Sequence, residues 1–523
     1  MEIRGDNMIG PGKGIDTDQF YVLCTNILGG CQGSTGPSSV NPATGKPYGS
    51  AFPEITIGDM VKAQKLLLDN MGIEQLHGVI GGSAGGLQVL EWAVSYPTLV
   101  KRVTCIASAE SLSAQALSFD IIARKIIMAD PSWNGGDYYD QGLPEKGLSL
   151  ARMIGHITYL SKESMDRKFG RERREDIKSD VFNTDFQIES YLNYQGSSFV
   201  DRFDANSFLH ITAAMNSFSV AERAESLGAA FEKSTARFLF IAVSSDWLYP
   251  IEQSLELAET LLQTGKQVTY YNLKAPYGHD SFLIENAELS GMIGSFFDND
   301  QTIPAEAEDK VIQKEYETVS KLIDEPGRVL DLGCGDGTFL KKLQDERGLI
   351  GHGVDIDTAS LIECSRKGIS TFQFDLDEDV RLIPDDSYDY AVLNRTLLEV
   401  HKPHQLLHEI LRIAKQGIIS FANFGHWKHR LRLGLKGVLP QSGALPYDWY
   451  DTPNIHFLTL NDFKTFCRKN NIDIIKILCI PDGLVGSLFK GCGFCNLGAD
   501  RVIAKIARGD GSGKTSDPCK QRK

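Results

Sequence analysis

The five residues from Gly81 to Gly85 constrain this chain more than any other part of its sequence. They read Gly-Gly-Ser-Ala-Gly and match G-x-S-x-G, in which a serine occupies a sharp turn between a strand and a helix. Apolar residues precede the motif at 76–80, and residues 86–93 follow it with helical spacing. Such a strained turn needs glycine where a side chain would clash, and it exposes the hydroxyl of Ser83. The motif therefore predicts a nucleophilic serine on an α/β fold.

A serine nucleophile needs a histidine that removes its proton and a carboxylate that orients the histidine. On folds with this motif the chain order is serine, acid, histidine. Asp246 follows the apolar run 238–243, and His279 follows a predicted strand at 268–273. Each residue alone would equally fit an ordinary turn or loop. Because both follow strand ends, where doubly wound sheets place their chemistry, we expect a triad of Ser83, Asp246 and His279.

Several segments of residues 8–299 resemble the homoserine O-acetyltransferases. The matching stretches are residues 10–13, 41–45, 81–92, 151–160, 202–206 and 278–280. The resemblance implies acyl transfer from acyl-CoA to the hydroxyl of L-homoserine, through an acyl-serine, in methionine biosynthesis. It implies that Arg152 and Asp280 bind the carboxylate and the amine of homoserine, which suits their charges. The backbone N–H of Ala84 would donate to the oxyanion. The other reading of Arg152 is a surface arginine of a lid helix.

The acyl donor stays open between acetyl-CoA and succinyl-CoA, because both occur on this scaffold; the family favours acetyl. A simple esterase on the same fold is a further alternative.

The start of the chain departs from the family pattern, and this departure bears on all of these readings. The family carries an oxyanion loop after an early strand, whereas here the first predicted strand is residues 19–24. We expect either a start upstream of Met1 or an impaired acyltransferase half, since one lost oxyanion donor costs about 10²–10³ in rate.

A second signature lies at residues 328–337, which predict a strand, a glycine loop and a helix from Thr338. The dinucleotide pattern fails because Thr338 stands where its third glycine would be. The segment resembles motif I of the Rossmann-like S-adenosylmethionine methyltransferases. That resemblance implies these cofactor-binding residues: Asp331, Gly333, Gly335, Gly337, Asp355 for the ribose hydroxyls and Asp375 for the adenine amine. A nucleotide-free Rossmann-like domain with acidic turns is the alternative.

Residues 327–478 resemble one branch more closely, the methionine-biosynthesis MetW family. The match lies at 423–427, 444–447 and 449–456. The family's own reaction is poorly defined, so two readings compete. One is a methyltransferase with an unknown acceptor. The other, favoured by fusion to a methionine-pathway enzyme, is a module that senses S-adenosylmethionine and controls the acyltransferase.

The predicted fold class is α/β: an N-terminal α/β-hydrolase fold with a helical lid and its first strands missing, then a Rossmann-like methyltransferase-type domain. The predicted boundaries are 1–299 for the first domain with its lid at 112–216, 300–314 for a linker, 315–508 for the second domain, and 509–523 for a disordered tail. The lid of such folds often carries a dimer contact, so we expect a homodimer.

The charge and composition of the chain limit the classes of partner that it is expected to bind. Lys and Arg number 54 against 68 Asp and Glu, a net charge of −14, which argues against nucleic acid. No apolar run is long enough for a membrane span, no secretion signal opens the chain, and 10 scattered cysteines suit a reducing cytoplasm. We expect no metal, because His404 and His408, four apart on a predicted helix, lack a third ligand nearby.

Overall fold

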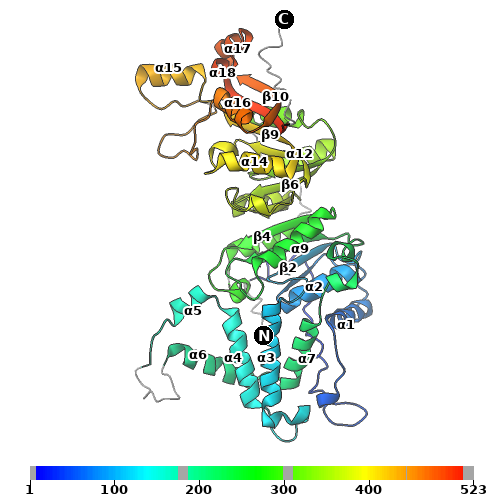
Figure 1. Ribbon diagram of the computed structural model, residues 1–523. Helices are drawn as coiled ribbons and strands as arrows, with labels where there is room; N and C mark the ends of the chain where they lie inside the picture. Colours follow the sequence, from blue (N-terminus) through cyan, green and yellow to red (C-terminus); the bar gives the residue numbers. More distant parts are fainter. Residues whose placement is uncertain (1–7, 175–185, 285, 299–309, 443, 510–523) are drawn as a thin grey trace. The chain divides into compact units, whose positions relative to one another are not determined.

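The computed structural model describes residues 8–174, 186–284, 286–298, 310–442 and 444–509 (Figure 1). The chain divides into two compact units, Met1–Phe297 and Asp298–Lys523. Each unit has its own sheet and its own buried core, and each is described in turn.

The first unit is built on four parallel strands in the order β1-β2-β3-β4. Strands β2 and β3 are almost entirely buried, as expected for parallel strands whose two faces are both covered. Their bounds are β1 (Val79–Gly82), β2 (Arg102–Ile106), β3 (Arg237–Val243) and β4 (Val268–Leu273). The helices outside the lid are α1 (Ile57–Asn70), α2 (Ala84–Ser95), α8 (Leu227–Ala230), α9 (Ile251–Gln263) and α10 (Ala287–Phe297).

The predicted strand at residues 19–24 is wrong. Within the described residues 8–56 the backbone forms turns, isolated bridges and the short 3₁₀ helix η2 (Gly49–Ala51), and no strand. The side chain of Tyr21 is 79% exposed. An apolar run becomes a strand only when a neighbouring strand takes its backbone N–H and C=O groups, and this segment has no such neighbour. Among the described strands β1 pairs with β2 alone, so the strand before Ser83 is an edge of this sheet.

A helical insert separates β2 from β3, in the part of the chain where the sequence predicts a lid at 112–216 (Figure 1). Its elements are α3 (Ala114–Ala129), the 3₁₀ helix η3 (Pro131–Gly136), α4 (Glu145–Tyr159), α5 (Lys162–Lys168), α6 (Gln187–Val200) and α7 (Ala205–Asn216). Glycines allow the helices to pack closely. A Cβ on Gly147 of α4 would lie 2.9 Å from the backbone of Ile127, and one on Gly196 would lie 2.3 Å from Ser149 Oγ. The insert therefore has a fixed core of its own.

Within its described residues, the second unit has seven strands in the order β7-β6-β5-β8-β9-β11-β10. All neighbours pair in parallel except β11, which is antiparallel to both β9 and β10. The chain winds outward from β5 to β7 and then restarts at β8 on the other side of β5. This reversal between β5 and β8 is a topological switch point, the place where open α/β sheets bind ligands. The predicted Rossmann-like fold is confirmed.

Within the described residues this unit contains the following strands and helices. The strands are β5 (Arg328–Leu332), β6 (Ile350–Asp355), β7 (Ser370–Gln373), β8 (Tyr388–Asn394), β9 (Ala414–Ala422), β10 (Ile472–Pro481) and β11 (Ala499–Arg508). The helices are α11 (Lys310–Ser320), α12 (Thr338–Arg347), α13 (Thr358–Arg366), α14 (Pro403–Ile413), α15 (Trp427–Lys436), α16 (Leu460–Lys469), α17 (Gly483–Gly491) and α18 (Cys495–Gly498).

Two predicted segments fall partly outside the described residues. Residues 300–309 of the predicted linker lie outside them, whereas 310–314 belong to helix α11. Residues 510–523 of the predicted tail also lie outside them. In the part of the chain that the structure describes, no helix is both long and apolar enough to cross a membrane.

Candidate active site

Ser83 occupies the sharp turn between β1 and α2. Its backbone has φ 56° and ψ −124°, a strained conformation that non-glycine residues rarely adopt. The turn is held by the Ser83 N–H, which donates to the Ile106 carbonyl at 2.9 Å. The flanking glycines are sterically required: a Cβ on Gly81 would lie 2.4 Å from the Gly85 carbonyl oxygen, and one on Gly82 would lie 2.5 Å from the Phe282 ring.

Helix α2 starts directly after the serine, at Ala84. The first N–H groups of a helix have no partner within it, and they carry the positive end of the helix dipole. The N–H of Ala84 therefore lies where a negative charge developing next to Ser83 would be stabilised.

The acid and the base of the expected triad form a buried pair. Asp246 Oδ2 and His279 Nδ1 are 2.6 Å apart, and the two side chains are almost completely buried. The other Asp246 oxygen accepts the backbone N–H groups of Leu248 at 2.9 Å and Tyr249 at 3.0 Å. The imidazole stacks on Tyr249 and meets Phe282 edge-on. These contacts fix one orientation of the ring, with Nδ1 directed to the carboxylate.

The serine lies on the same edge of the sheet as this pair. Strands β1, β3 and β4 are parallel, and Ser83, Asp246 and His279 each follow the carboxyl end of one of them. Phe282 connects the two sides, because its ring contacts both the Gly82 backbone and the His279 ring. Within the described residues no hydrogen bond joins Ser83 Oγ to His279. Catalytic hydrogen bonds are often longer without substrate, and they shorten in the reacting complex.

The end of lid helix α4 is anchored to the loops that carry the acid and the base. Trp247 Nε1 donates to the Leu160 carbonyl at 3.0 Å, and Ser161 Oγ donates to the Pro276 carbonyl. Gly278 has φ 83°, and a Cβ there would lie 2.4 Å from Ser161 N. Only glycine allows the histidine loop to approach the lid this closely. The predicted lid thus contacts the predicted catalytic loops.

Arg152 and Asp280, which the family resemblance assigned to substrate binding, lie near each other beside His279. The Arg152 guanidinium is held between the rings of Tyr159 and Phe199, at 5.3 and 4.7 Å from their centroids. Among the described residues it forms no ion pair, and its Nε is buried without a partner. Asp280 Oδ1 is also buried without a partner. Burial raises the pKa of Asp280, while His279 and Arg152 lower it.

The fold adds polar groups that the sequence did not identify. His156 and Tyr159 follow Arg152 on α4 at helical spacing, and the hydroxyl of Tyr191 on α6 lies 3.1 Å from His156 Nδ1. Burial, with the nearby charge of Arg152, lowers the pKa of His156 to about 4, so this imidazole is neutral at pH 7. Asp120 on α3 acts electrostatically on Tyr159 and Tyr249, whose rings lie against His279, and burial raises the pKa of Asp120 to about 6. Spacing along α4 was the one signal that could have found His156 and Tyr159.

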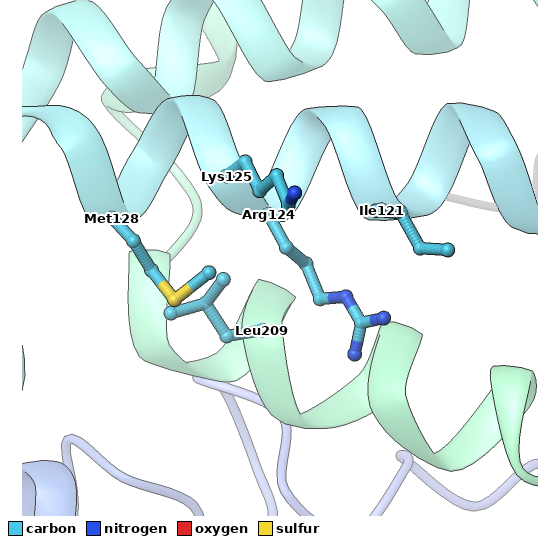
Figure 2. A pocket seen from close by; sticks show the side chains of 5 residues that line it. All are labelled: Ile121, Arg124, Lys125, Met128 and Leu209. Atoms are coloured by element: carbon cyan, nitrogen blue, oxygen red, sulfur yellow. The ribbon is translucent and has the colours of Figure 1, made fainter.

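The outer side of the lid carries a hollow of about 370 Å³ between α3 and α7. Figure 2 shows Arg124 extending from α3 toward the helix that carries Leu209. The full lining is Ile121, Arg124, Lys125, Met128 and Leu209. No residue of the expected triad lines this hollow, so it is separate from the candidate active site.

In the second unit, the predicted glycine loop follows β5 and lies at the switch point. Gly333, Gly335 and Gly337 all have positive φ, at 77°, 52° and 74°. A Cβ on Gly333 would lie 2.4 Å from Thr396 Oγ1 and one on Gly337 would lie 2.8 Å from Cys364 Sγ, whereas Gly335 faces open space. The open side at Gly335 allows a ligand to approach the backbone.

Carboxylates surround this loop. Asp355 Oδ2 accepts the Gly335 N–H at 2.8 Å, and its Oδ1 accepts the Asp357 N–H at 3.0 Å. Asp331 Oδ1 is buried without a partner, and burial together with the charge of Asp355 holds the pKa of Asp331 well above its usual value. Burial and Asp355 also raise the pKa of Glu399. A cationic ligand would stabilise the charged forms of these carboxyl groups.

Asp375, the third predicted acidic residue, follows β7 and forms a turn. Its Oδ1 accepts the Asp377 N–H at 2.9 Å, and its own N–H donates to Asp379 Oδ2. The turn places Asp375 at the carboxyl edge of the sheet, as Asp355 is placed after β6.

Known proteins resemble both units. Residues 6–285 match the family described as alpha/beta hydrolase fold, and residues 313–484 match the family described as methionine biosynthesis protein MetW. The bifunctional methionine biosynthesis protein MetXA/MetW of Rhodopirellula baltica is 41% identical over 484 residues, which are 90% of this chain and 78% of that protein.

Two further similarities concern the first part of the chain. A homoserine O-acetyltransferase of Solidesulfovibrio magneticus is 53% identical over 298 residues, 56% of this chain and 75% of that protein. The crystal structure of homoserine O-acetyltransferase from Bacillus anthracis superposes with a TM-score of 0.53 at 28% identity, covering 57% of this chain and 82% of the other. Both family resemblances expected from the sequence are confirmed.

Proposed function

The chain belongs to the family of the bifunctional MetXA/MetW methionine biosynthesis proteins, and from this we propose that its first unit transfers an acetyl group from acetyl-CoA to the hydroxyl of L-homoserine. One observation carries the proposal: a strained serine follows β1 on the edge of the sheet where Asp246 and His279 form a buried pair. Homoserine O-acetyltransferases that match this part of the chain support the choice of substrate and acyl group.

In the proposed reaction each step is carried out by a residue of this site. His279 Nε2 removes the proton of Ser83 Oγ, which attacks the thioester carbonyl, and the Ala84 N–H donates to the resulting oxyanion. The carbon–sulfur bond breaks, the coenzyme A thiolate takes the proton from His279, and an acyl-serine remains. The same imidazole then removes the proton of the homoserine hydroxyl, whose oxygen attacks the acyl carbonyl. The bond between that carbon and Ser83 Oγ breaks, and Ser83 Oγ takes the proton from His279. Asp246 stabilises the imidazolium in both halves.

The decisive experiment measures coenzyme A thiol release by the full chain with acetyl-CoA or succinyl-CoA, with and without L-homoserine. We expect release that depends on homoserine, faster with acetyl-CoA, and ping-pong kinetics. Faster release with succinyl-CoA would identify the other acyl donor. Hydrolysis of simple esters without homoserine-dependent release would contradict the proposal and indicate an esterase.

We propose that Arg152 and Asp280 bind the carboxylate and the ammonium of homoserine. The unpartnered Arg152 Nε and Asp280 Oδ1 support this role, because a zwitterionic amino acid would satisfy both. Arg152→Ala should lower kcat/KM for homoserine by about 10²–10³, since a charged hydrogen-bonding partner is lost. Acylation of Ser83 by acetyl-CoA alone, measured as a single-turnover burst, should change much less.

The matched control for this prediction is Lys125→Ala, which removes an exposed cationic side chain of α3 that lines the hollow of the lid. Equal losses of kcat/KM in the two variants would show that lid stability, rather than substrate binding, underlies the effect. A burst reduced as strongly as kcat/KM would also contradict the assignment of Arg152 to homoserine.

We propose that the second unit binds S-adenosylmethionine at the switch point. The open face of Gly335, the carboxylate of Asp355 and the unpartnered Asp331 fit a cationic nucleoside ligand, and the match to the MetW family supports the site. Gly333 and Gly337 shape the loop, Asp355 would accept from the ribose hydroxyls, and Asp375 would accept from the adenine amine. When bound, this cofactor supplies an electrophilic methyl group on a sulfonium.

Asp355→Ala should weaken binding of S-adenosylmethionine by about 10²-fold, because two hydrogen bonds to a charged acceptor are lost. Isothermal titration calorimetry of the full chain measures this change. The matched control is Asp345→Ala on α12, whose carboxylate is exposed and pairs with Lys341; it should bind as the unchanged chain does. Undiminished binding in Asp355→Ala would place the ligand elsewhere.

Two roles for this unit are distinguished by one further assay. A sensor predicts that added S-adenosylmethionine inhibits homoserine-dependent coenzyme A release, and that Asp355→Ala abolishes the inhibition. A methyltransferase predicts a methylated product and no effect on acyl transfer. We favour the sensor, because the ligand would be a downstream product of the reaction catalysed by the first unit. We further propose that the chain forms a homodimer, supported by the exposed Ile121, Ile122 and Met128 on lid helix α3. We also propose that it acts in the cytoplasm.

A further inference from the structure

Two histidines and an aspartate meet inside the second unit. His426 precedes α15, His429 lies in its first turn, and Asp500 is the second residue of β11. His426 Nδ1 is 3.9 Å and His429 Nε2 is 4.0 Å from Asp500 Oδ1. Each residue offers one possible ligand atom, and these three atoms all lie within 4.8 Å of one another.

The cluster is buried, and its polar atoms lack partners. His426 is 0% and His429 is 1% exposed, and Asp500 is 8% exposed. None of the four imidazole nitrogens, nor Asp500 Oδ1, makes a hydrogen bond of normal geometry to the described residues. Each buried polar atom without a partner is costly to the fold. One such atom from each of the three residues lies within 4.8 Å of the other two, which indicates a ligand that satisfies them together.

No described cation compensates the buried carboxylate. Lys428, beside His426, pairs with Asp482 instead of Asp500, and Arg430 Nε donates to the Gly425 carbonyl. The site combines a carboxylate with two imidazoles whose nitrogens form no hydrogen bond of normal geometry to the described residues, which is a donor set for a cation.

Hydrogen bonds between the surrounding loops hold the three side chains close to one another. Asn423 Nδ2 donates to the Asn496 carbonyl at 2.9 Å and to the Ala499 carbonyl at 2.7 Å, which joins the loop before α15 to the start of β11. The carbonyls of Asn423 and Phe424 also interact with His429. A carbonyl acting on one imidazole nitrogen while the other faces a metal is the usual arrangement around a histidine ligand.

We propose that His426, His429 and Asp500 bind a divalent transition-metal ion of the zinc type. Imidazole nitrogen and carboxylate oxygen are ligands that Zn²⁺ and its neighbours Co²⁺ and Ni²⁺ accept in proteins. Ligand atoms of a tetrahedral zinc site lie about 3.3–3.6 Å apart, given metal–ligand distances of about 2.0–2.2 Å. Shifts of about an ångström would close the three atoms around an ion, leaving a fourth position for water.

The ion would tie the start of α15 to β11 at the carboxyl edge of the sheet. Strand β11 neighbours β9, with Arg501 opposite Ala422, and β8 then separates β9 from β5 and its glycine loop. Strands are spaced by about 4.8 Å, so β9 lies about 10 Å along the sheet from β5. The metal site is thus distinct from the glycine loop. The sequence could not indicate it, because Asp500 is remote from the two histidines along the chain.

The test titrates the metal-stripped full chain with Co²⁺ alone, followed by visible absorption, and then displaces Co²⁺ with Zn²⁺. We expect one Co²⁺ per chain with the absorption of a tetrahedral nitrogen–oxygen site, and displacement by Zn²⁺. His426→Ala and Asp500→Asn should each weaken binding more than 100-fold. The matched control is His404→Ala with His408→Ala, two exposed histidines four apart on α14 that could bind metal adventitiously; binding should not change.

Three results would overturn the proposal. The first is Co²⁺ binding that survives in Asp500→Asn, and the second is Co²⁺ binding that is lost in the His404 and His408 control. The third is no Co²⁺ binding at one equivalent, which would mean that ordered water occupies the cluster. Asp500→Asn keeps the shape of the side chain, so it decides the question even if His426→Ala does not fold. As an independent measure, Zn²⁺ should raise the Tm of the unchanged chain and of the control, but not that of Asp500→Asn.

Discussion

Replacing Ser83 with alanine should lower homoserine-dependent coenzyme A release by at least about 10⁴-fold, because the side chain that carries the acyl group is removed. The half reaction should fail as well. Acetyl-CoA alone should give no burst of thiol and no acetylated protein by mass spectrometry. The fold should tolerate the change, since the turn is held by the Ser83 N–H and by the neighbouring glycines rather than by the hydroxyl.

The matched control is Ser132→Ala, an exposed serine of η3 in the lid, which should keep full activity. Turnover in Ser83→Ala within tenfold of the unchanged chain would end the acyl-serine mechanism. Direct transfer from coenzyme A to homoserine, with His279 as the base, would then be the remaining route through this site.

Asp246→Asn should lower kcat by about 10⁴-fold while leaving the structure intact. The amide oxygen of asparagine can still accept the N–H groups of Leu248 and Tyr249, so the loop keeps its hydrogen bonds. The amide NH₂, however, would donate to His279 Nδ1 where the carboxylate accepts. The imidazole would then carry its proton on Nε2, which could no longer remove the proton of Ser83.

Measuring kcat and Tm together tests this prediction. We expect a Tm within a few degrees of the unchanged chain beside the large loss of kcat. The variant that combines Ser83→Ala and Asp246→Asn should be no less active than Ser83→Ala alone, because the three residues act as one unit. Losses that multiply would mean that Asp246 supports the fold rather than the base.

Strands and turns that are specified by residues adjacent in the sequence were predictable. Strand β4 was placed at its observed bounds, and β3 within a residue, because uninterrupted apolar runs next to turn residues leave few alternatives. The same holds for the turn at Ser83, where Gly81 and Gly82 leave no room for a side chain. The run at 19–24 misled for a physical reason: it has the composition of a strand, but no described strand lies beside it.

Patterns that depend on contacts across the fold were predictable only through family resemblance, or not at all. Arg152 and Asp280 came from the resemblance, and their proximity to each other came from the packing of α4 against the histidine loop. His156 and Tyr191 entered the site because α6 packs beside α4. Asp500 joined His426 and His429 because an antiparallel last strand returns to the same edge of the sheet.

The sequence by itself determined the two α/β units, the serine turn, the glycine loop and the order of acid and base. Each of these features depends on residues that are adjacent in the chain or that follow a recognisable strand. Only the tertiary structure decided which buried polar groups find partners. It paired Asp246 with His279 and left Arg152 Nε, Asp280 Oδ1 and the His426 imidazole without any described partner. Burial and distance are properties of the folded chain, and they decide where a ligand must complete the structure.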